Sequence, residues 1–265
     1  MVQDKYSEEK SLLLNVIKKA GKIILDSYKK KILIEAKGSL DIVTDVDKKV
    51  EKFIISSIKK KFPSHKILGE ESGLDETKSN YIWIIDPIDG TNNFSRGISF
   101  FCCSIAFCQI SHDKITPLVG GIYDPIHNEL FHAEKERGAH LNCKKINVSS
   151  ASKINEAIIE FDEGHAKNER SFEKFKHLNR EIRAGRRFGS TALASAYVSC
   201  GRFEALINSG AKTWDMAAGA LIIKEAGGML FDLDKSEWDF ILNKRGIIAT
   251  NKNLHKTILD LIAWD

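Results

Sequence analysis

The most informative stretch of the chain is Trp83-Ile84-Ile85-Asp86-Pro87-Ile88-Asp89-Gly90-Thr91-Asn92. Its first apolar residues predict a buried strand that brings Asp86 to its carboxyl end, where Pro87 interrupts regular strand pairing. Gly90 permits a tight turn, and a helix is expected to begin near Thr91. Such a turn can aim Asp86 and Asp89 at one point. It also presents the first backbone N–H groups of the helix to an anion such as phosphate.

Two carboxylates beside one phosphate would repel it, so this turn suits a phosphate only when divalent cations lie between the negative groups. Carboxylate oxygens are hard ligands, which favours magnesium over softer metals. The same Asp-Pro-Xaa-Asp-Gly pattern also occurs as a simple polar turn. The stretch alone leaves both interpretations open.

Three further acidic segments point to the same chemistry, although each has an ordinary structural explanation. The pair Glu70-Glu71 follows a short apolar run, where a surface turn would also explain it. Asp47 lies three residues after Thr44 at a predicted helix start, so the two residues could form a capping box. Asp215 stands at the start of a helix of small residues, where capping is again a sufficient reason. Together the four acidic segments favour a metal site over four unrelated turns.

Hydrophobic periodicity divides the rest of the chain into elements. Apolar residues recur every three or four positions over residues 8–28 and again from Thr44 until Pro63, which predicts two amphipathic helices joined by a loop at Gly38-Ser39-Leu40-Asp41. Short apolar runs bounded by turn residues predict strands at 67–68, 81–85, 100–110, 118–123, 129–131, 203–207, 229–232 and 247–250. Later helices are predicted at 191–199, 214–226 and 253–263.

Composition excludes several classes of protein. The 265 residues are 43% hydrophobic and 29% charged, as in ordinary globular proteins. No apolar run reaches the roughly 18 residues of a membrane span, and the first residues lack a secretory pattern, so we expect a cytoplasmic protein without membrane partners. A formal charge of +4 is too small to indicate nucleic acid binding. The five cysteines include no CxxC pair, and of the neighbours Cys102 and Cys103 at most one is expected to face a core.

Four motifs resemble those of the inositol monophosphatase family of magnesium-dependent, lithium-sensitive phosphatases. They are Val43-Thr44-Asp45-Val46-Asp47, Gly69-Glu70-Glu71-Ser72, Trp83 through Phe94 (WIIDPIDGTNNF), and Trp214-Asp215-Met216-Ala217-Ala218-Gly219 with Glu225-Ala226-Gly227-Gly228. They fall in the family order over about residues 8–262, and four motifs in order do not match by chance.

The resemblance implies an α/β fold of the sugar-phosphatase type, a layered α/β/α/β/α sandwich. We expect one compact unit with two halves. The N-terminal half, 1–146, would carry the metal and phosphate motifs, and the C-terminal half, 147–265, would carry the substrate-contacting loop and the last metal ligand.

The resemblance also implies roles residue by residue. The ligands of two or three magnesium ions would be Glu70, Asp86, the carbonyl of Ile88, Asp89 and Asp215. Asp47 and Thr91 would orient the attacking water, with Glu70 as a third catalytic residue, and Thr44 rather than Asp47 would then cap the helix. The phosphate would bind the N–H groups of Gly90, Thr91 and Asn92. Contacts to the substrate are expected from Asp89, Gly189, Ser190, Thr191, Asn208 and Asp215.

This assignment agrees with the chemistry of phosphate esters, whose hydrolysis needs charge neutralisation and positioning more than covalent help. Two cations about 4 Å apart can hold a phosphate oxygen, lower the pKa of an attacking water and stabilise the leaving alkoxide. Ser190 is no candidate nucleophile, because its flanks lack the second glycine of G-x-S-x-G. We therefore expect a magnesium-dependent phosphomonoesterase that acts on a small polyol phosphate, first of all inositol-1-monophosphate.

One departure from the family bears on the substrate. Inositol-specific members carry a glutamate seven residues before the position of Asp215, whereas this chain has Asn208, whose amide can donate as well as accept. Fructose 1,6-bisphosphate and 3'(2'),5'-bisphosphate nucleotides are therefore alternative substrates. A regulatory binding protein without turnover is a further alternative, which the complete acidic set disfavours. The resemblance also implies a homodimer.

Overall fold

The computed structural model describes residues 5–37, 41–112, 114–162, 169–242 and 246–262. Most of the predicted loop after residue 37 and the last residue of the helix predicted over 253–263 lie outside these ranges. Within them, every helix falls short of the length or the apolarity that crossing a membrane demands.

Two long helices, α1 (Ser7–Ser27) and α2 (Asp45–Lys61), form where the apolar spacing predicted them. A capping box between Thr44 and Asp47 begins α2, and three lysines in its last turn complement the helix dipole. The shorter helices are α3 (Thr91–Ser95), the 3-10 helix η1 (Ile154–Glu156), α4 (Glu169–Glu181), α5 (Thr191–Ser199), α6 (Thr213–Glu225) and α7 (His255–Leu261).

The strands of the described ranges form two larger sheets and a two-stranded hairpin. The large sheet has the order β10-β9-β8-β7-β6-β5-β3-β4, the small sheet has the order β12-β11-β13-β15-β14, and β1 (Ile34–Ala36) pairs with β2 (Ile42–Thr44). The large sheet comprises β3 (Lys66–Gly69), β4 (Gly73–Leu74), β5 (Tyr81–Asp89), β6 (Cys102–Ser111), β7 (Lys114–Asp124), β8 (Glu129–Glu134), β9 (Ala139–Leu141) and β10 (Lys144–Ile146). The small sheet comprises β11 (Ile158–Asp162), β12 (Ala184–Arg186), β13 (Ala205–Asn208), β14 (Met229–Phe231) and β15 (Ile247–Thr250).

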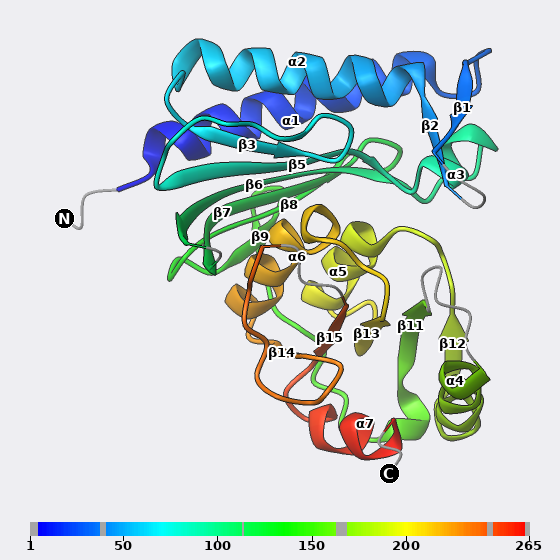
Figure 1. Cartoon of the computed structure of the whole chain (residues 1–265). Helices are drawn as coiled ribbons and strands as arrows, with labels where there is room; N and C mark the ends of the chain where they lie inside the picture. The colour runs from blue at the N-terminus through cyan, green and yellow to red at the C-terminus, as the bar shows by residue number, and fades with distance from the viewer. Residues whose placement is uncertain (1–4, 38–40, 113, 163–168, 243–245, 263–265) are drawn as a thin grey trace.

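Sheets and helices stack in five layers (Figure 1). Helices α1 and α2 cover one face of the large sheet, where Ile17, Ile54 and Trp83 share one apolar core. Helices α5 and α6 fill the space between the two sheets. Helices α4 and α7 pack on the outer face of the small sheet. The predicted α/β/α/β/α sandwich is therefore confirmed.

Strand β5 carries the central motif and continues to Asp89, beyond the predicted end at Ile85. Its pairing with β6 shifts register between Asp86 and Asp89, so the strand passes Pro87 as an irregularity and does not end there. Residues three apart in a regular strand point to opposite faces. The register shift therefore allows two carboxylates of this one strand to point the same way.

Cys102 and Cys103 are both fully buried, so the expectation that at most one would face a core was wrong. The two neighbours do point to opposite faces of β6, but helices cover both faces of this sheet. Cys103 joins the core with α1 and α2, and Cys102 joins the core with α5 and α6.

The sequence patterns missed the shortest elements. Strands β1, β2, β4, β9, β10 and β12 have only two or three residues each, too few to show an alternating pattern. Strand β11 and helix α4 were not predicted either.

Candidate active site

A cleft of about 490 Å³ opens where β5 ends, and both halves of the chain line it. Its lining residues are Asp41, Glu70, Asp86, Ile88, Asp89, Gly90, Thr91, Asn92, Asn93, Asp162, Arg187, Phe188, Gly189, Thr191, Asn208, Gly210, Ala211, Lys212, Trp214 and Asp215. All the predicted metal-ligand positions are among them.

Three carboxylates meet in this cleft. Asp86 and Asp89 come from β5, and Asp215 comes from the first turn of α6. One oxygen of each lies within 4.8 Å of the other two. Burial is the main cause that raises the pKa of Asp86 and Asp215 well above the usual aspartate range, and neighbouring carboxylates raise it further.

The cluster fits a divalent cation. Oδ1 of Asp86 is buried and has no hydrogen-bond donor among the described residues. Burial also raises the pKa of Asp89, although hydrogen bonds from Ser190 and Ala192 oppose that shift. A hard cation among these oxygens would relieve their repulsion and give the unpaired oxygen of Asp86 a partner.

Asp89 and Asp215 each use one oxygen to hold a helix start. Oδ2 of Asp89 accepts from the backbone N–H of Ala192 (2.6 Å) and from the hydroxyl of Ser190 (2.5 Å), at the beginning of α5. Oδ2 of Asp215 accepts from the backbone N–H of Lys212 (2.7 Å), just before α6. A carboxylate has two oxygens, so capping and metal binding do not exclude each other.

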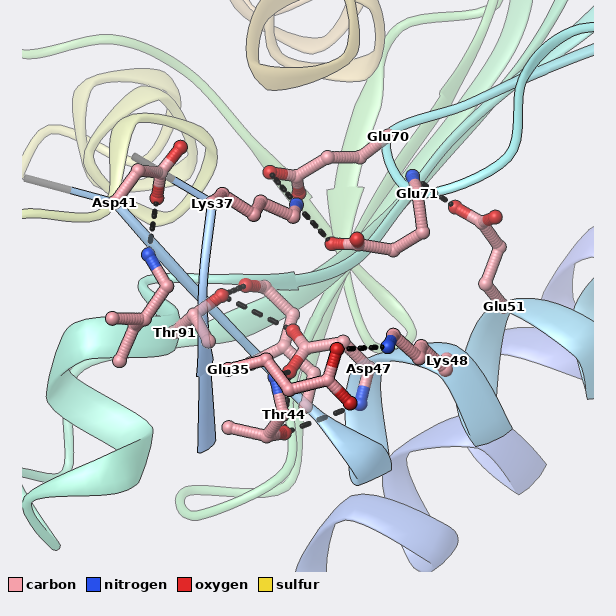
Figure 2. Close-up of polar contacts among 12 residues, drawn as sticks. Glu35, Lys37, Asp41, Thr44, Asp47, Lys48, Glu51, Glu70, Glu71 and Thr91 are labelled. Carbon is pink, nitrogen blue, oxygen red and sulfur yellow. Dashed lines mark hydrogen bonds and ion pairs between the residues drawn. The ribbon is translucent and has the colours of Figure 1, made fainter. Parts of the chain in front are cut away.

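Glu70 lines the same cleft as the cluster and stands on a turn whose neighbouring residues Figure 2 shows. Lys37 forms an ion pair with Oε1 of Glu70 (3.2 Å) and a second one with Glu71. Glu51 on α2 accepts from the N–H groups of Glu71 (2.9 Å) and Ser72 (2.8 Å), which fixes the turn that presents Glu70. Burial raises the pKa of Glu70, and Lys37 opposes that shift.

Asp47 is fully buried and contacts two threonines (Figure 2). Its Oδ2 accepts from the backbone N–H of Thr44 (2.8 Å) and from the hydroxyl of the same residue. Its Oδ1 lies 3.1 Å from the hydroxyl of Thr91, so the two residues expected to orient the water are in contact. Burial raises the pKa of Asp47 to about 6, against the effect of the Thr44 hydrogen bonds. Asp47 also completes the capping box, which corrects the expectation that Thr44 alone caps α2.

The end of β5, the turn at Gly90 and the start of α3 place Ile88, Gly90 and Asn92 along the cleft. Gly90 has a φ of 93°, in the left-handed region that favours glycine. A Cβ on Gly90 would lie 3.0 Å from the carbonyl oxygen of Phe100 and 3.2 Å from Cβ of Ser190. The left-handed backbone and the close approach of Phe100 and Ser190 therefore both favour glycine here.

The predicted substrate residues of the C-terminal half do not all face the cleft. Gly189, Thr191 and Asn208 line it. The hydroxyl of Ser190 is buried and turned toward Asp89.

The amide of Asn208 is used by the chain itself. Its Nδ2 donates to the hydroxyl of Thr191 (2.7 Å), and its Oδ1 accepts from the N–H groups of Gly210 (2.8 Å) and Ala211 (2.9 Å). These bonds use the carbonyl oxygen and one of the two N–H donors that were expected to read a substrate hydroxyl.

Sequence reasoning missed the cations and braces of the cleft. Arg187 forms an ion pair with Asp162 (2.9 Å), and Lys212 lies 3.8 Å from Asp41. Arg187 and Lys212 both line the cleft. Like Lys37 and Glu51, they contact residues that lie far away in the sequence. No local pattern marks them in the sequence.

Residues 6–263 match the family model described as the inositol monophosphatase family. Inositol monophosphatase 3 of Solanum lycopersicum is 40% identical over 89% of this chain and 90% of its own. Inositol-1-monophosphatase of Bacillus subtilis (strain 168) is 37% identical over 92% of each chain. Nus factor SuhB of Haemophilus influenzae is 38% identical over 95% of this chain and 94% of its own.

Solved structures with the same fold include two informative cases. The extragenic suppressor protein suhB from Bartonella henselae superposes with a TM-score of 0.89 and 33% identity, over 95% of this chain and 97% of its own. An IMPase/NADP phosphatase complexed with Mg²⁺ and phosphate has a TM-score of 0.85 and 27% identity, over 99% of this chain and 97% of its own.

Proposed function

Because this chain belongs to the inositol monophosphatase family, we propose that it hydrolyses inositol-1-monophosphate to inositol and inorganic phosphate. Membership of that family makes it a magnesium-dependent phosphoric monoester hydrolase. Relatives named inositol monophosphatase and relatives named Nus factor SuhB are almost equally similar to it, at 40% and 38% identity. Sequence identity alone therefore does not decide which phosphorylated alcohol is the substrate.

One observation carries the proposal: the acidic cluster and the pair of Asp47 and Thr91 come together where β5 ends. Thr91 lines the same cleft as the three clustered aspartates and contacts both Asp47 and the carbonyl of Ile88. A water held by this pair would lie next to a phosphate held at the cluster. The cleft of about 490 Å³ has room for a phosphorylated polyol.

Each part of the site would have one task. Magnesium held by the carboxylates of Glu70, Asp86, Asp89 and Asp215 and the carbonyl of Ile88 would offset the phosphate charge and acidify the attacking water. Asp47 would take a proton from that water, and Thr91 would fix its direction toward phosphorus. The N–H groups of Gly90, Thr91 and Asn92 would bind the phosphate oxygens.

A specific observation keeps the bisphosphates as second candidates. Arg187 and Lys212 bring positive charge to the rim of the cleft, where Asp162 and Asp41 face them. A second anionic group on the substrate would compete with these two carboxylates.

A substrate panel tests the proposal. Purified protein with magnesium is given inositol-1-monophosphate, fructose 1,6-bisphosphate and a 3',5'-bisphosphate nucleotide, and the release of phosphate is followed. We expect kcat/KM for inositol-1-monophosphate to exceed the others at least about ten-fold, a difference of about 1.4 kcal/mol. A faster bisphosphate would overturn the named substrate but not the phosphatase activity. No release from any ester would favour the regulatory binding protein.

Three finer properties belong to the same proposal. We expect two or three magnesium ions per site, inhibition by lithium and a homodimer. Metal titration by calorimetry, phosphate release in lithium chloride and sedimentation at micromolar concentration test them in turn.

A further inference from the structure

The loop between β12 and α5, residues 187–190, forms one wall of the cleft, and we call it the substrate loop. Hydrogen bonds hold both the backbone N–H and the carbonyl oxygen of one of its residues, Phe188. The N–H of Phe188 donates to both oxygens of Glu160 on β11, at 2.9 and 3.2 Å. The carbonyl oxygen of Phe188 accepts from Nδ2 of Asn93 on α3, at 2.6 Å.

Glu160 occupies a position that suits an apolar side chain. It is only 2% exposed. Ile158, two residues earlier on the same face, and Leu206, its partner on β13, both pack in the core against α5 and α6. Burying a carboxyl group there costs free energy unless hydrogen bonds compensate for the lost contacts with water. Among the described residues, its side-chain oxygens accept from the substrate loop.

The substrate loop in turn contacts two carboxylates that line the cleft. Arg187 pairs with Asp162, and both line the cleft, whereas the hydroxyl of Ser190 donates to Asp89 of the acidic cluster. Gly189 lies between them with a φ of 73°, so the chain bends sharply there. A shift of Phe188 would therefore move Arg187 and Gly189 more freely than Ser190, which α5 and Asp89 hold.

We propose that Glu160 is a positioning residue, which through the N–H of Phe188 sets the place of the substrate loop and so the affinity for the alcohol part of the phosphate ester. It is not expected to touch the substrate, and it lies outside the cleft lining. The proposal rests on the phosphatase activity of the chain and not on which alcohol it accepts.

Titration of Glu160 provides a signature that a purely structural residue would lack. Burial, aided by the charge of Asp162, raises its pKa to about 8. The charged groups around it are Asp162 on its own strand, Arg187 in the loop and Arg186, its register partner on β12. An ionised Glu160 would repel Asp162 and draw Arg187 away from it, so KM is expected to rise above pH 8.

The test compares three variants. Glu160→Leu removes the acceptor and puts an apolar side chain of similar size in its place. Glu160→Gln keeps an acceptor for Phe188 but cannot ionise. Glu204→Leu is the matched control, because Glu204 is also buried and accepts the N–H of Ile158 (2.7 Å) at the other end of β11.

Phosphate release is measured with inositol-1-monophosphate and with para-nitrophenyl phosphate, which reports phosphatase chemistry whatever the natural alcohol. For Glu160→Leu we expect at least a five-fold rise in KM for inositol-1-monophosphate, with kcat within two-fold and an unchanged inhibition constant for inorganic phosphate. Glu160→Gln should restore KM to within two-fold at pH 7 and abolish its rise above pH 8. If inositol-1-monophosphate is not turned over, the fastest ester of the panel replaces it.

Any of three results would overturn the proposal. An unchanged KM in Glu160→Leu, or an equal rise in Glu204→Leu, would make the role of Glu160 merely structural. The third is a Glu160→Gln enzyme with the same dependence of KM on pH as the parent. This third result decides the matter even if Glu160→Leu does not fold.

Discussion

The hydroxyl of Thr91 lies 3.1 Å from Oδ1 of Asp47 and 2.9 Å from the carbonyl oxygen of Ile88. A hydroxyl has one hydrogen to donate, so it can satisfy only one of these acceptors at a time. Its remaining lone pairs are free to accept from a water. The contact joins α2 to the start of α3, and the proposed function gives Asp47 a role beyond the cap of its own helix.

Replacing Thr91 by valine tests that role with almost no change in side-chain volume. We expect kcat to fall about 100-fold, the lower range for a lost acid–base contribution, with little change in magnesium requirement. Thr44→Val is the control, since it removes the other threonine hydroxyl on Asp47. Loss of a cap should cost about 1 kcal/mol of folding stability and leave most activity. A Thr91→Val enzyme with kcat within two-fold of the parent would show that Asp47 needs no such partner.

Glu51 offers a test of how the turn at Glu70 is held. Glu51→Ala leaves the N–H groups of Glu71 and Ser72 without their acceptor, so Glu70 should lose its fixed position. We expect weaker magnesium binding by at least about five-fold in calorimetry, equivalent to roughly 1 kcal/mol. Glu51→Gln retains an acceptor, so its magnesium affinity should lie between that of the parent and that of Glu51→Ala. Equal magnesium affinity in all three would contradict the bracing role.

The raised pKa of Glu160 also predicts how stability depends on pH. The folded protein keeps this proton up to about pH 8, whereas the unfolded chain releases it near pH 4.5. Folding therefore loses stability as pH rises between these values, by at most about 1.4 kcal/mol per pH unit, and the loss is complete above the folded pKa. Glu160→Gln has no such loss. Its melting temperature relative to the parent should increase from pH 5 to pH 8 and then level off, and a constant difference would argue against the shift.

The hydrogen bonds of Asn208 change what its substitution should do. The sequence suggested that a glutamate here would favour inositol phosphates, but Asn208→Glu removes the donor to Thr191. We expect kcat/KM to fall about five-fold for every ester of the panel, in line with one lost hydrogen bond. Asn208→Asp keeps an acceptor for Gly210 and Ala211, so its kcat/KM should fall less than that of Asn208→Glu. A selective ten-fold gain for inositol-1-monophosphate would instead show that this residue reads the alcohol.

Local patterns predicted the long elements well. The apolar spacing of α1 and α2 and the cap at Thr44 are contained in single segments, so the sequence reveals them. The acidic motifs are local too, because each stands where a strand or helix must turn. Short strands such as β12 are defined by their partners and leave no pattern of their own.

The rest of the site depends on contacts across the chain. Lys37 reaches Glu70 over 33 residues, and Glu160 holds Phe188 over 28 residues. Capping and a role in the site looked like alternatives for Asp47 and Asp215, since a sequence does not show what each carboxylate oxygen faces. Only the structure shows which group each of the two oxygens contacts.

The central claim is that the carboxylates of Asp86, Asp89 and Asp215 hold the magnesium of a phosphatase. Asp89→Asn keeps a side chain of the same size that can still accept from Ala192, but it removes the charge. Release of phosphate from inositol-1-monophosphate should fall at least about 100-fold in this variant and vanish for the parent protein in chelator, with folding unchanged. Asp239→Asn, at an exposed ion pair with Lys114, should retain full activity. Full activity of Asp89→Asn, or undiminished turnover in chelator, would contradict the claim.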